Sequence, residues 1–428
     1  MFMSSINFSR TILHCDLNNF FASVEGILNP DLKPPFAVCG DPETRTGIVL
    51  AKCELAKSFG VKTGEPIWQA RKKCPNLSIV PPRHGVYSKY SQKVRDIYAR
   101  YTDLVESFGI DECWLDVTAS EKLFGDGMQI ANRIMKEVKT ELGLGLSIGI
   151  AWNKSYAKIA SDIAPPSGIL HITRENYASK ILTLSVNSLL YVGRKSNAYF
   201  AKLGIKTVGD LANYDPELLK HKLGITAKKI IKSARGEDYS PVENITYKDD
   251  PKSVGNGITL PQDISAIREV VQVLYVLSEE VATRMRRKNV RGTTISLSVR
   301  RPDLSWIGAQ KTITAPTHNA QTIARTALEI LPSLQPVNGD STSPIRALRI
   351  AVSNLEKDTM AQIDLFDALT EHAAQKYNKK QDALSALFDD IRKKHGKSKI
   401  TFGHGIGGVI DITEFSDENT SDPFGNKA

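Results

Sequence analysis

Three acidic residues stand in apolar segments where an ionised side chain is costly. Asp16 interrupts the run ILHCDL, and Asp111 and Glu112 interrupt GIDECWLDV. A buried carboxylate needs a compensating cation, which is either an Arg or Lys side chain or a divalent metal ion, for which oxygen ligands are suited. Carboxylates that converge on strand ends match the two-metal arrangement used for phosphoryl and nucleotidyl transfer. Alternatively, Asp16 caps a helix that begins near Asn18, and the other two acids only end a strand.

The elements that position these acids alternate between strand and helix. The run TILHCDL predicts a strand that leads into the helical pattern FFASVEGIL, and short runs between Pro34 and Pro82 predict a small α+β insertion. SFGIDECWLDVT predicts a buried strand or hairpin, and GLGLSIGIAW predicts another strand. The helix between these two segments carries Ile130, Ile134 and Val138 on one face. An α/β or α+β sheet domain therefore holds the acids.

The later part of the chain has a different character. From about Ser185 the pattern is helical with Gly-centred turns, and the polar stretch SPVENITYKDDPKS predicts a linker. The segments after it predict a β-sheet with two helices on one face, followed by a polar tail with one helix at 382–394.

The charge of the chain favours a polyanionic partner. The 428 residues hold 56 Lys and Arg against 47 Asp and Glu, a net charge of +9. Residues 191–240 hold ten basic and five acidic residues, and residues 281–311 hold eight basic residues and one acid. The excess therefore lies in two regions away from the three acids. Hydrophobic residues make up 41% of the chain, which excludes a mostly disordered protein and, at this length, predicts about two to four domains.

Cysteine usage and the amino terminus bear on location. The five cysteines form no C-x-x-C pair and have no His at zinc-ligand spacing, so we expect a reducing compartment and no structural zinc. The amino terminus MFMSSINFSR lacks the pattern of a signal peptide, and no window approaches about eighteen uninterrupted apolar residues. We therefore expect a cytoplasmic protein with no membrane segment.

Two motifs carry a family resemblance. D-L-N-N-F-F-A-S-V-E at 16–25, with S-F-G-I-D-E at 107–112, resembles the signature pair of the Y-family DNA polymerases, in particular the bacterial DNA polymerase IV-like branch. GIVLAK, FGVKTGEPIWQA, NKSYAKIASDIA and KSVGNGIT recur in the same order, so the resemblance spans about residues 11–366. It implies an α+β multi-domain fold of right-hand shape: a palm (1–18 and 85–174), small fingers (19–84), a helical thumb (175–240), a linker (241–251), a β-sheet and two-helix little finger (252–356) and a tail (357–428).

The resemblance also implies a catalytic site with two Mg²⁺ ions. Asp16 and Asp111 would each hold both ions, Glu112 would complete the ion that activates the primer 3′-hydroxyl, and the Leu17 carbonyl would join the ion carried by the triphosphate. Phe21 matches the family's steric gate against ribonucleotides, although a plain core residue would fit there too. The residues expected to contact the nucleotide are Asn19, Phe20, Phe21 and Lys57.

Around the triphosphate this sequence departs from the family pattern. Glu54 and Lys57 stand where the family commonly has Tyr and Arg, and Pro165 replaces a Lys before Pro-x-Gly. Lys keeps the charge of Arg but loses its bidentate geometry, whereas Pro loses the donor. Asn18 replaces an acid near the metals. These changes predict weakened nucleotide binding and a slow but active polymerase.

Two further kinds of contact follow from the resemblance. The residues expected to contact the DNA backbone are Gly193, Arg194, Lys195, Gly224, Lys228 and Lys229 in the thumb, and Arg291, Thr294, Arg300 and Arg301 in the little finger. Lys-rich helices exposed only to water would give the same thumb pattern. A peptide in the tail resembles the clamp-binding peptide of bacterial polymerases and consists of Gln362, Ile363, Asp364, Leu365 and Phe366.

The sequence thus predicts a template-directed, error-prone DNA polymerase for translesion synthesis. Its partners would be primer-template DNA, a deoxynucleoside triphosphate (dNTP) and the bacterial sliding clamp, and it would act as a monomer. A catalytically weak or inactive adaptor that binds DNA and the clamp is the alternative, which Glu54 and Pro165 favour and the intact acids disfavour. A two-metal nuclease fits less well, because the order of the segments matches polymerases and we expect no water-activating His or Lys beside the acids.

Overall fold

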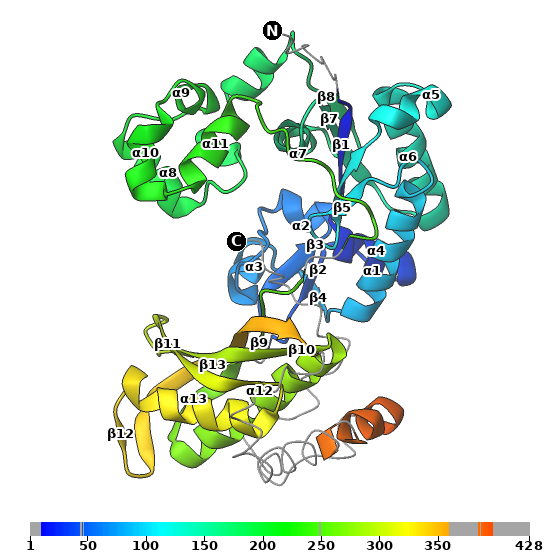
Figure 1. The fold of residues 1–428 in the computed structure, drawn as a ribbon. Coiled ribbons are helices and arrows are strands. Elements are labelled where there is room, and N and C mark those ends of the chain that lie inside the picture. Colours follow the sequence, from blue (N-terminus) through cyan, green and yellow to red (C-terminus); the bar gives the residue numbers. More distant parts are fainter. Residues whose placement is uncertain are drawn as a thin grey trace. The chain divides into compact units, whose positions relative to one another are not determined.

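The computed structural model describes residues 10–358, except 43, 44, 46, 248 and 249, and residues 384–396, except 386. The chain divides into two units (Figure 1). The first comprises residues 1–40 and 48–248, and the second comprises residues 41–47 and 249–428.

The first unit is built on a five-stranded sheet with the order β5-β6-β1-β7-β8. The strands are β1 (Ile12–Leu17), β5 (Val105–Ser107), β6 (Glu112–Asp116), β7 (Leu146–Ala151) and β8 (Ile169–His171). Strand β1 lies at the centre and pairs antiparallel with both β6 and β7. Its position between two partners accounts for its largely apolar composition, because both edges and both faces are covered.

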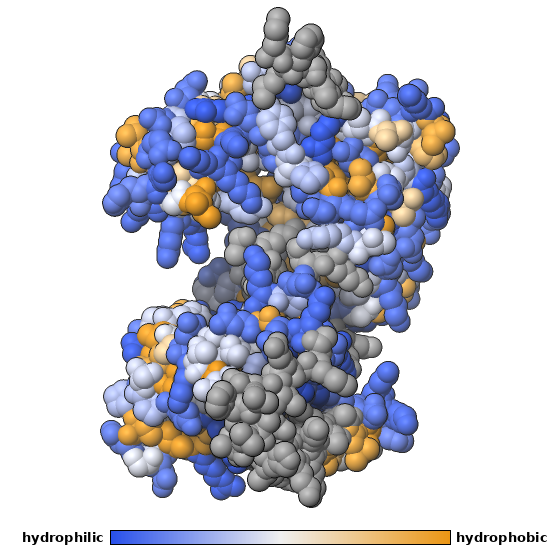
Figure 2. Space-filling view, viewed as in Figure 1, coloured by the Kyte–Doolittle hydropathy of each residue, from blue (hydrophilic) through white to orange (hydrophobic). Residues whose placement is uncertain are grey.

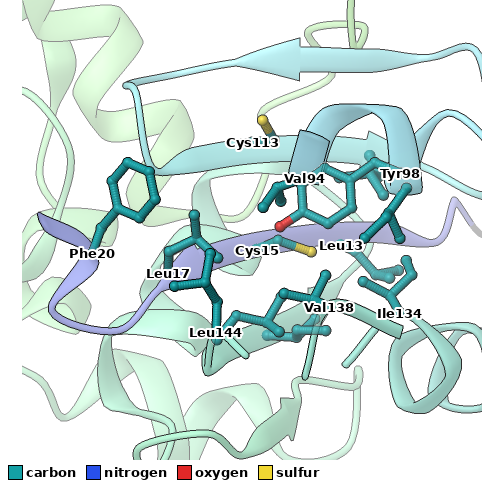
Figure 3. Close-up of a cluster of buried hydrophobic side chains, with 14 of the residues drawn as sticks. Leu13, Cys15, Leu17, Phe20, Val94, Tyr98, Cys113, Ile134, Val138 and Leu144 are labelled. Carbon is teal, nitrogen blue, oxygen red and sulfur yellow. The ribbon is translucent and has the colours of Figure 1, made fainter. Parts of the chain in front are cut away.

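Side chains alternate between the two faces of this sheet. Leu13, Cys15 and Leu17 join the core against α4 (His84–Tyr98) and α6 (Gly127–Leu142), as Figure 3 shows. His14 and Asp16 lie on the opposite face, where they contact α7 (Lys154–Ile163). The alternation therefore separates the apolar core of β1 from its polar residues.

A glycine lets α7 approach the sheet closely. A Cβ at Gly149 of β7 would lie 2.0 Å from the carbonyl oxygen of Ala157 and 2.3 Å from the backbone nitrogen of Ser161. Any larger residue would push the helix away from β1. At its start, α7 is capped by the Asn153 side chain, which accepts from the backbone N–H of Tyr156.

A small α+β insertion follows β1. It contains α1 (Phe20–Leu28), β2 (Phe36–Cys39), β3 (Val49–Lys52), α2 (Glu54–Ser58), α3 (Ile67–Lys73) and β4 (Ser78–Val80). The three strands form a separate sheet with the order β3-β2-β4. Between β6 and α6 lie the short elements η1 (Thr118–Ser120) and α5 (Glu121–Phe124).

The helical region follows β8. Its elements are η2 (Ala178–Leu182), η3 (Val186–Ser188), α8 (Arg194–Lys202), α9 (Val208–Ala212), α10 (Pro216–Leu223) and α11 (Thr226–Ala234). Its apolar residues share one core with Ile12, Trp114 and Tyr156 of the sheet domain. The Tyr156 hydroxyl also donates to the carbonyl of Ala234, which ties the end of α11 to α7.

The second unit is a twisted antiparallel sheet covered by two helices. Its strands are β9 (Ser253–Ala266), β10 (Val290–Arg300), β11 (Trp306–Thr317), β12 (Val337–Asn338) and β13 (Ser341–Lys357), with the order β11-β10-β13-β12 and β9 also paired with β13. Helices α12 (Ile267–Arg287) and α13 (Ala320–Leu334) pack on the apolar face, to which Ile295, Leu297 and Val299 of β10 contribute. The predicted sheet with two helices is therefore present.

A helix of the tail lies on α12. Residues 384–385 and 387–395 are helical. Asp389 accepts hydrogen bonds from Thr283 and Arg286 of α12, and Arg392 donates to Glu279 at 2.7 Å. The predicted clamp-binding peptide, 362–366, lies outside the described residues.

Candidate active site

The three predicted acids meet at adjoining strand ends. Asp16 of β1 lies opposite Glu112 of β6 in the antiparallel register. Asp111 is the last residue of the turn between β5 and β6, and its carbonyl accepts from the backbone N–H of Leu17 at 3.0 Å. The hairpin predicted from SFGIDECWLDVT thus places Asp111 and Glu112 beside Asp16, which lies far away along the chain.

A lysine that the sequence analysis did not single out lies among these acids. The Nζ atom of Lys158 on α7 lies 2.9 Å from Oε2 of Glu112, 3.3 Å from Oδ2 of Asp16 and 2.9 Å from Oδ1 of Asp162. The Lys158 side chain is only 9% exposed. A buried ammonium is stable only with such partners, and Lys158 in turn balances part of the negative charge of Asp16 and Glu112.

His14 is a second buried residue in contact with Glu112. It is fully buried, and its Nε2 lies 3.4 Å from Oε2 of Glu112. Its Nδ1 lies 2.7 Å from the hydroxyl of Ser161 on α7. The imidazole therefore bridges β1, the acid on β6 and the helix that carries Lys158.

Burial and the charges of neighbouring groups shift the pKa values of the three acids. Burial, together with the nearby charge of Glu112, raises the pKa of Asp16 to about 7 and that of Asp111 to about 6. Burial also acts on Glu112, but the close contact with His14 and the charge of Lys158 outweigh it and lower the pKa of Glu112 to about 2. One ammonium is thus too little charge for three carboxylates, and a further cation would complete their ionisation.

The acids suit a hard divalent cation, although their side chains are not gathered around one point. Within the described part of the chain, no three His, Cys, Asp or Glu side chains form a group that could hold a metal ion. Lys158 contacts Asp16 and Glu112. The Oδ1 atom of Asp111 instead lies 3.2 Å from the position that a Cβ on Gly109 would take. The donor set is nevertheless the oxygen-rich one that Mg²⁺ prefers. Asp16, Asp111, Glu112 and the Leu17 carbonyl are the groups that would hold it.

The predicted gate residue has an aromatic support. The ring of Phe21 stacks on Tyr87 with centroids 4.1 Å apart and planes 14° apart. The Tyr87 hydroxyl donates to Glu25 at 2.6 Å, and Arg83 pairs with the same carboxylate. Phe20 is buried in the core, whereas Phe21 is only half-buried, so the two neighbours have different environments.

Three of the residues that were expected near the triphosphate form one cluster. Asn19 adopts a left-handed conformation with φ of 50° before α1, which Asn tolerates, and its amide donates to Oε2 of Glu54 at 3.0 Å. Lys57 lies 3.3 Å from the same carboxyl group. The hydrogen bond from Asn19, followed by that from Lys57, lowers the pKa of Glu54. An ionised Glu54 therefore offsets the charge of Lys57.

The other two departures from the family pattern, Asn18 and Pro165, are linked through Ser147. The Asn18 amide donates to the hydroxyl of Ser147 at 3.1 Å, and that hydroxyl lies 3.2 Å from the carbonyl oxygen of Pro165. Ser147 lies opposite Asp16 in the register of β1 and β7. These contacts fix the end of α7 near the acids without a charged side chain.

The predicted DNA-contact residues of the helical region lie at its turns. Gly193 precedes α8, and Gly224 lies between α10 and α11. A Cβ added at either glycine would meet no atom within 4 Å, so the backbone there is open to a ligand. Arg194 and Lys195 are exposed. Lys228 pairs with Glu217, and Lys229 lies over the Tyr191 ring at 4.4 Å. Figure 2 shows predominantly hydrophilic side chains over these helices.

The four predicted DNA-contact residues of the second unit differ in exposure. Arg301 is exposed, and Arg300 is half-buried beside the Trp306 ring. Arg291 pairs with Asp358. Thr294 is only 3% exposed, and its hydroxyl lies between Thr312 and Asn354. The burial of Thr294 does not fit the expected contact with the DNA backbone: the alternation of β10 places this residue off the apolar face, but neighbouring strands cover it.

Sequence reasoning missed the residues that support the acids, and the expectation that no His or Lys lies beside them is wrong. Lys158 lay in the motif NKSYAKIASDIA, where a lysine within small apolar residues was the available signal, and His14 lay inside the strand ILHCDL. Tyr87 stood on α4 with no signal that distinguishes it from a core residue. Each of the three contacts a partner more than fifty positions away along the chain: His14 contacts Glu112, Lys158 contacts Asp16 and Tyr87 contacts Phe21.

Comparisons with known proteins agree on one family. The impB/mucB/samB family matches residues 15–162, and its C-terminal domain matches residues 251–365. DNA polymerase IV of Acetivibrio thermocellus is 41% identical over 396 residues, which are 92% of this chain and 97% of that protein. A solved Y-family DNA polymerase chimera of Dbh and Dpo4 superposes with a TM-score of 0.69 and 26% identity, over 80% of this chain and 98% of that one. The chain belongs to the Y family of DNA polymerases.

A further Y-family relative gives the same result. DNA polymerase IV 2 of Bacillus subtilis is 37% identical over 399 residues, which are 91% of this chain and 93% of that protein. The resemblance and the α+β multi-domain fold are therefore confirmed. These comparisons give no support to the adaptor alternative. Among the described residues, this Y-family chain has no helix long and apolar enough to cross a bilayer.

Proposed function

We propose that the chain is an error-prone, template-directed DNA polymerase for translesion synthesis, which uses two Mg²⁺ ions to join dNTPs to a primer 3′-hydroxyl. The convergence of Asp16, Asp111 and Glu112 at adjoining strand ends of one sheet supports this proposal most strongly. Bound ions would lower the pKa of the attacking hydroxyl and neutralise the leaving pyrophosphate. The chain itself supplies carboxylates that burial leaves short of positive charge.

Phe21 would exclude ribonucleotides. A ring that rests flat on Tyr87 cannot move aside when a ribose 2′-hydroxyl approaches, because Tyr87 is itself buried and bonded to Glu25. A bulky, fixed ring discriminates by steric exclusion and needs no polar contact. Asn19, Phe20 and Lys57 would line the rest of the nucleotide site.

Glu54 would weaken binding of the triphosphate. Its carboxylate shares Asn19 and Lys57, the groups that otherwise face the phosphates. Because Glu54 is 57% exposed, water screens much of its charge. We therefore expect a reduced affinity for dNTPs and an active enzyme.

The basic helical region and the second unit would hold the duplex. Arg194, Lys195, Lys228 and Lys229, with the turns at Gly193 and Gly224, would contact phosphates of the backbone. Arg291, Arg300 and Arg301 would do so from the second unit. Such contacts carry no sequence information, as a polymerase requires. Low fidelity would follow from the small insertion after β1, and the described residues contain no further domain that could act as a proofreading nuclease.

Outside the described residues, Gln362 to Phe366 would dock on the sliding clamp. We expect a monomer in the cytoplasm that reaches its template through this peptide. The Gln and the Leu-Phe pair suit an apolar pocket on the clamp.

A primer-extension assay with a matched variant tests the proposed chemistry. Asp111→Asn should abolish incorporation, whereas Asp96→Asn, which removes an exposed acid of α4, should leave the rate unchanged. Binding of primer-template should be equal in all three proteins. Incorporation that survives Asp111→Asn would contradict the assigned role, and a folded wild-type protein that binds DNA without extending it would favour the adaptor.

A further inference from the structure

The ammonium of Lys158 contacts two of the three acids that are proposed to hold metal ions. It contacts Asp16 and Glu112, two of the three proposed ligands, at 3.3 Å and 2.9 Å. Its third partner is Asp162, one helical turn further along α7 at 2.9 Å. The Asp162 side chain is 46% exposed and is not one of the proposed ligands.

The two kinds of partner have different consequences for the lysine. Contact with Asp16 and Glu112 places a positive charge on two proposed ligands of a divalent cation, and an ammonium and a cation that share the same carboxylates repel each other in a partly buried site. Contact with Asp162 needs only the helix itself, since the two residues are four positions apart. Lys158 can therefore leave the strand acids without losing every anionic partner.

We propose that Lys158 is the built-in counter-ion of the metal site: its ammonium holds Asp16 and Glu112 in the metal-free protein and withdraws to Asp162 when a divalent cation enters. Lys158 is then a positioning residue whose ammonium has two arrangements: one in contact with Asp16 and Glu112, and one in contact with Asp162 alone. The geometry of α7 permits this exchange, because the close approach at Gly149 brings Lys158 to the sheet while Asp162 remains near the surface. The inference rests on the proposed metal site.

Manganese binding to the full chain, without DNA or nucleotide, tests the proposal. Mn²⁺ affinity is measured by electron paramagnetic resonance for the wild type, Lys158→Met, Asp162→Asn and the double variant. Lys158→Met should bind Mn²⁺ about tenfold more tightly, because the competing ammonium is gone. Lys154→Met is the matched control: it removes a lysine of the same helix that pairs with Glu106 at 2.6 Å, and it should leave the affinity unchanged.

The double variant separates this exchange from a simple charge effect. Asp162→Asn should weaken Mn²⁺ binding about threefold in the wild type and have no effect in the Lys158→Met background, because Asp162 acts through the lysine. Equal weakening in both backgrounds would overturn the proposal, as would an unchanged or weaker affinity of Lys158→Met. Tighter binding by Lys154→Met would overturn it too.

Two provisions keep the test decisive. If Lys158→Met does not fold without metal, Lys158→Arg replaces it: the guanidinium binds two carboxylates at once, so Mn²⁺ affinity should fall, and a rise would contradict the proposal. The titration needs no catalysis. A chain with the predicted affinities but no primer extension would reject the polymerase assignment alone, while normal extension with unaltered affinities would reject the counter-ion alone.

Discussion

Replacing Asp16 by Asn should stabilise the metal-free protein while it removes catalysis. Burial, with the charge of Glu112, raises the pKa of Asp16 from 3.8 to about 7. The folded protein therefore holds a proton on this group over a pH range in which the unfolded chain has released it. Stability falls as pH rises from about 4 to about 7, and the cost of ionisation is complete above that window.

The size of the effect follows from the shift. A change of about 3 units corresponds to about 4 kcal/mol at 1.36 kcal/mol per unit. The Asp16 side chain is 28% exposed and stays beside Lys158, so we reduce this to about 2 kcal/mol. Asp16→Asn should thus raise the free energy of unfolding by about 2 kcal/mol at pH 8 and by almost nothing at pH 4.

Urea denaturation of the full chain in the presence of EDTA, followed by tryptophan fluorescence, measures this difference. Asp96→Asn serves as the exposed control and should change stability by less than about 0.5 kcal/mol. Saturating Mg²⁺ should reduce the difference in the free energy of unfolding, because only the wild type keeps the Asp16 carboxylate as a ligand and is stabilised fully by the ion. A variant that is less stable than the wild type at pH 8, or a difference that does not vary with pH, would refute the reasoning.

Three further changes test the nucleotide and clamp contacts. Phe21→Ala should raise the efficiency of ribonucleotide incorporation by about tenfold or more, seen in extension assays with single ribonucleotides, whereas an unchanged ratio would make Phe21 a core residue only. Glu54→Gln should lower the KM for dNTP by up to about fivefold with kcat little changed, as expected for one exposed charge, and a higher KM would show that Glu54 supports binding. Deletion of residues 362–366 should remove stimulation of synthesis by the clamp and spare basal synthesis, while equal loss of both would argue against docking.

Local patterns predicted most of the elements. The apolar run ILHCDL anticipated β1, and the pattern after the linker anticipated two helices on one sheet, which are observed as α12 and α13. Polar residues inside apolar strands pointed to the site, because burial of an unpaired carboxylate is costly whatever the fold. The three acids were therefore predictable as a group.

Partners brought together by tertiary packing were not predictable in this way. Nothing along the chain links Lys158 to Asp16, which is 142 positions away, or Phe21 to Tyr87. The burial of Thr294 depends on Thr312 and Asn354 of neighbouring strands, which strand alternation alone does not reveal. The contact of Glu54 with Asn19 likewise required the left-handed turn before α1.

Incorporation that depends on the template base is the defining activity of a template-directed polymerase. The full chain is given primer-template DNA, Mg²⁺ and each dNTP singly, on four templates that differ only in the first unpaired base. We expect extension that follows the template base, with the complementary dNTP preferred in every case. A folded protein that binds the DNA but extends no primer, or adds the same nucleotide whatever the template, would contradict it.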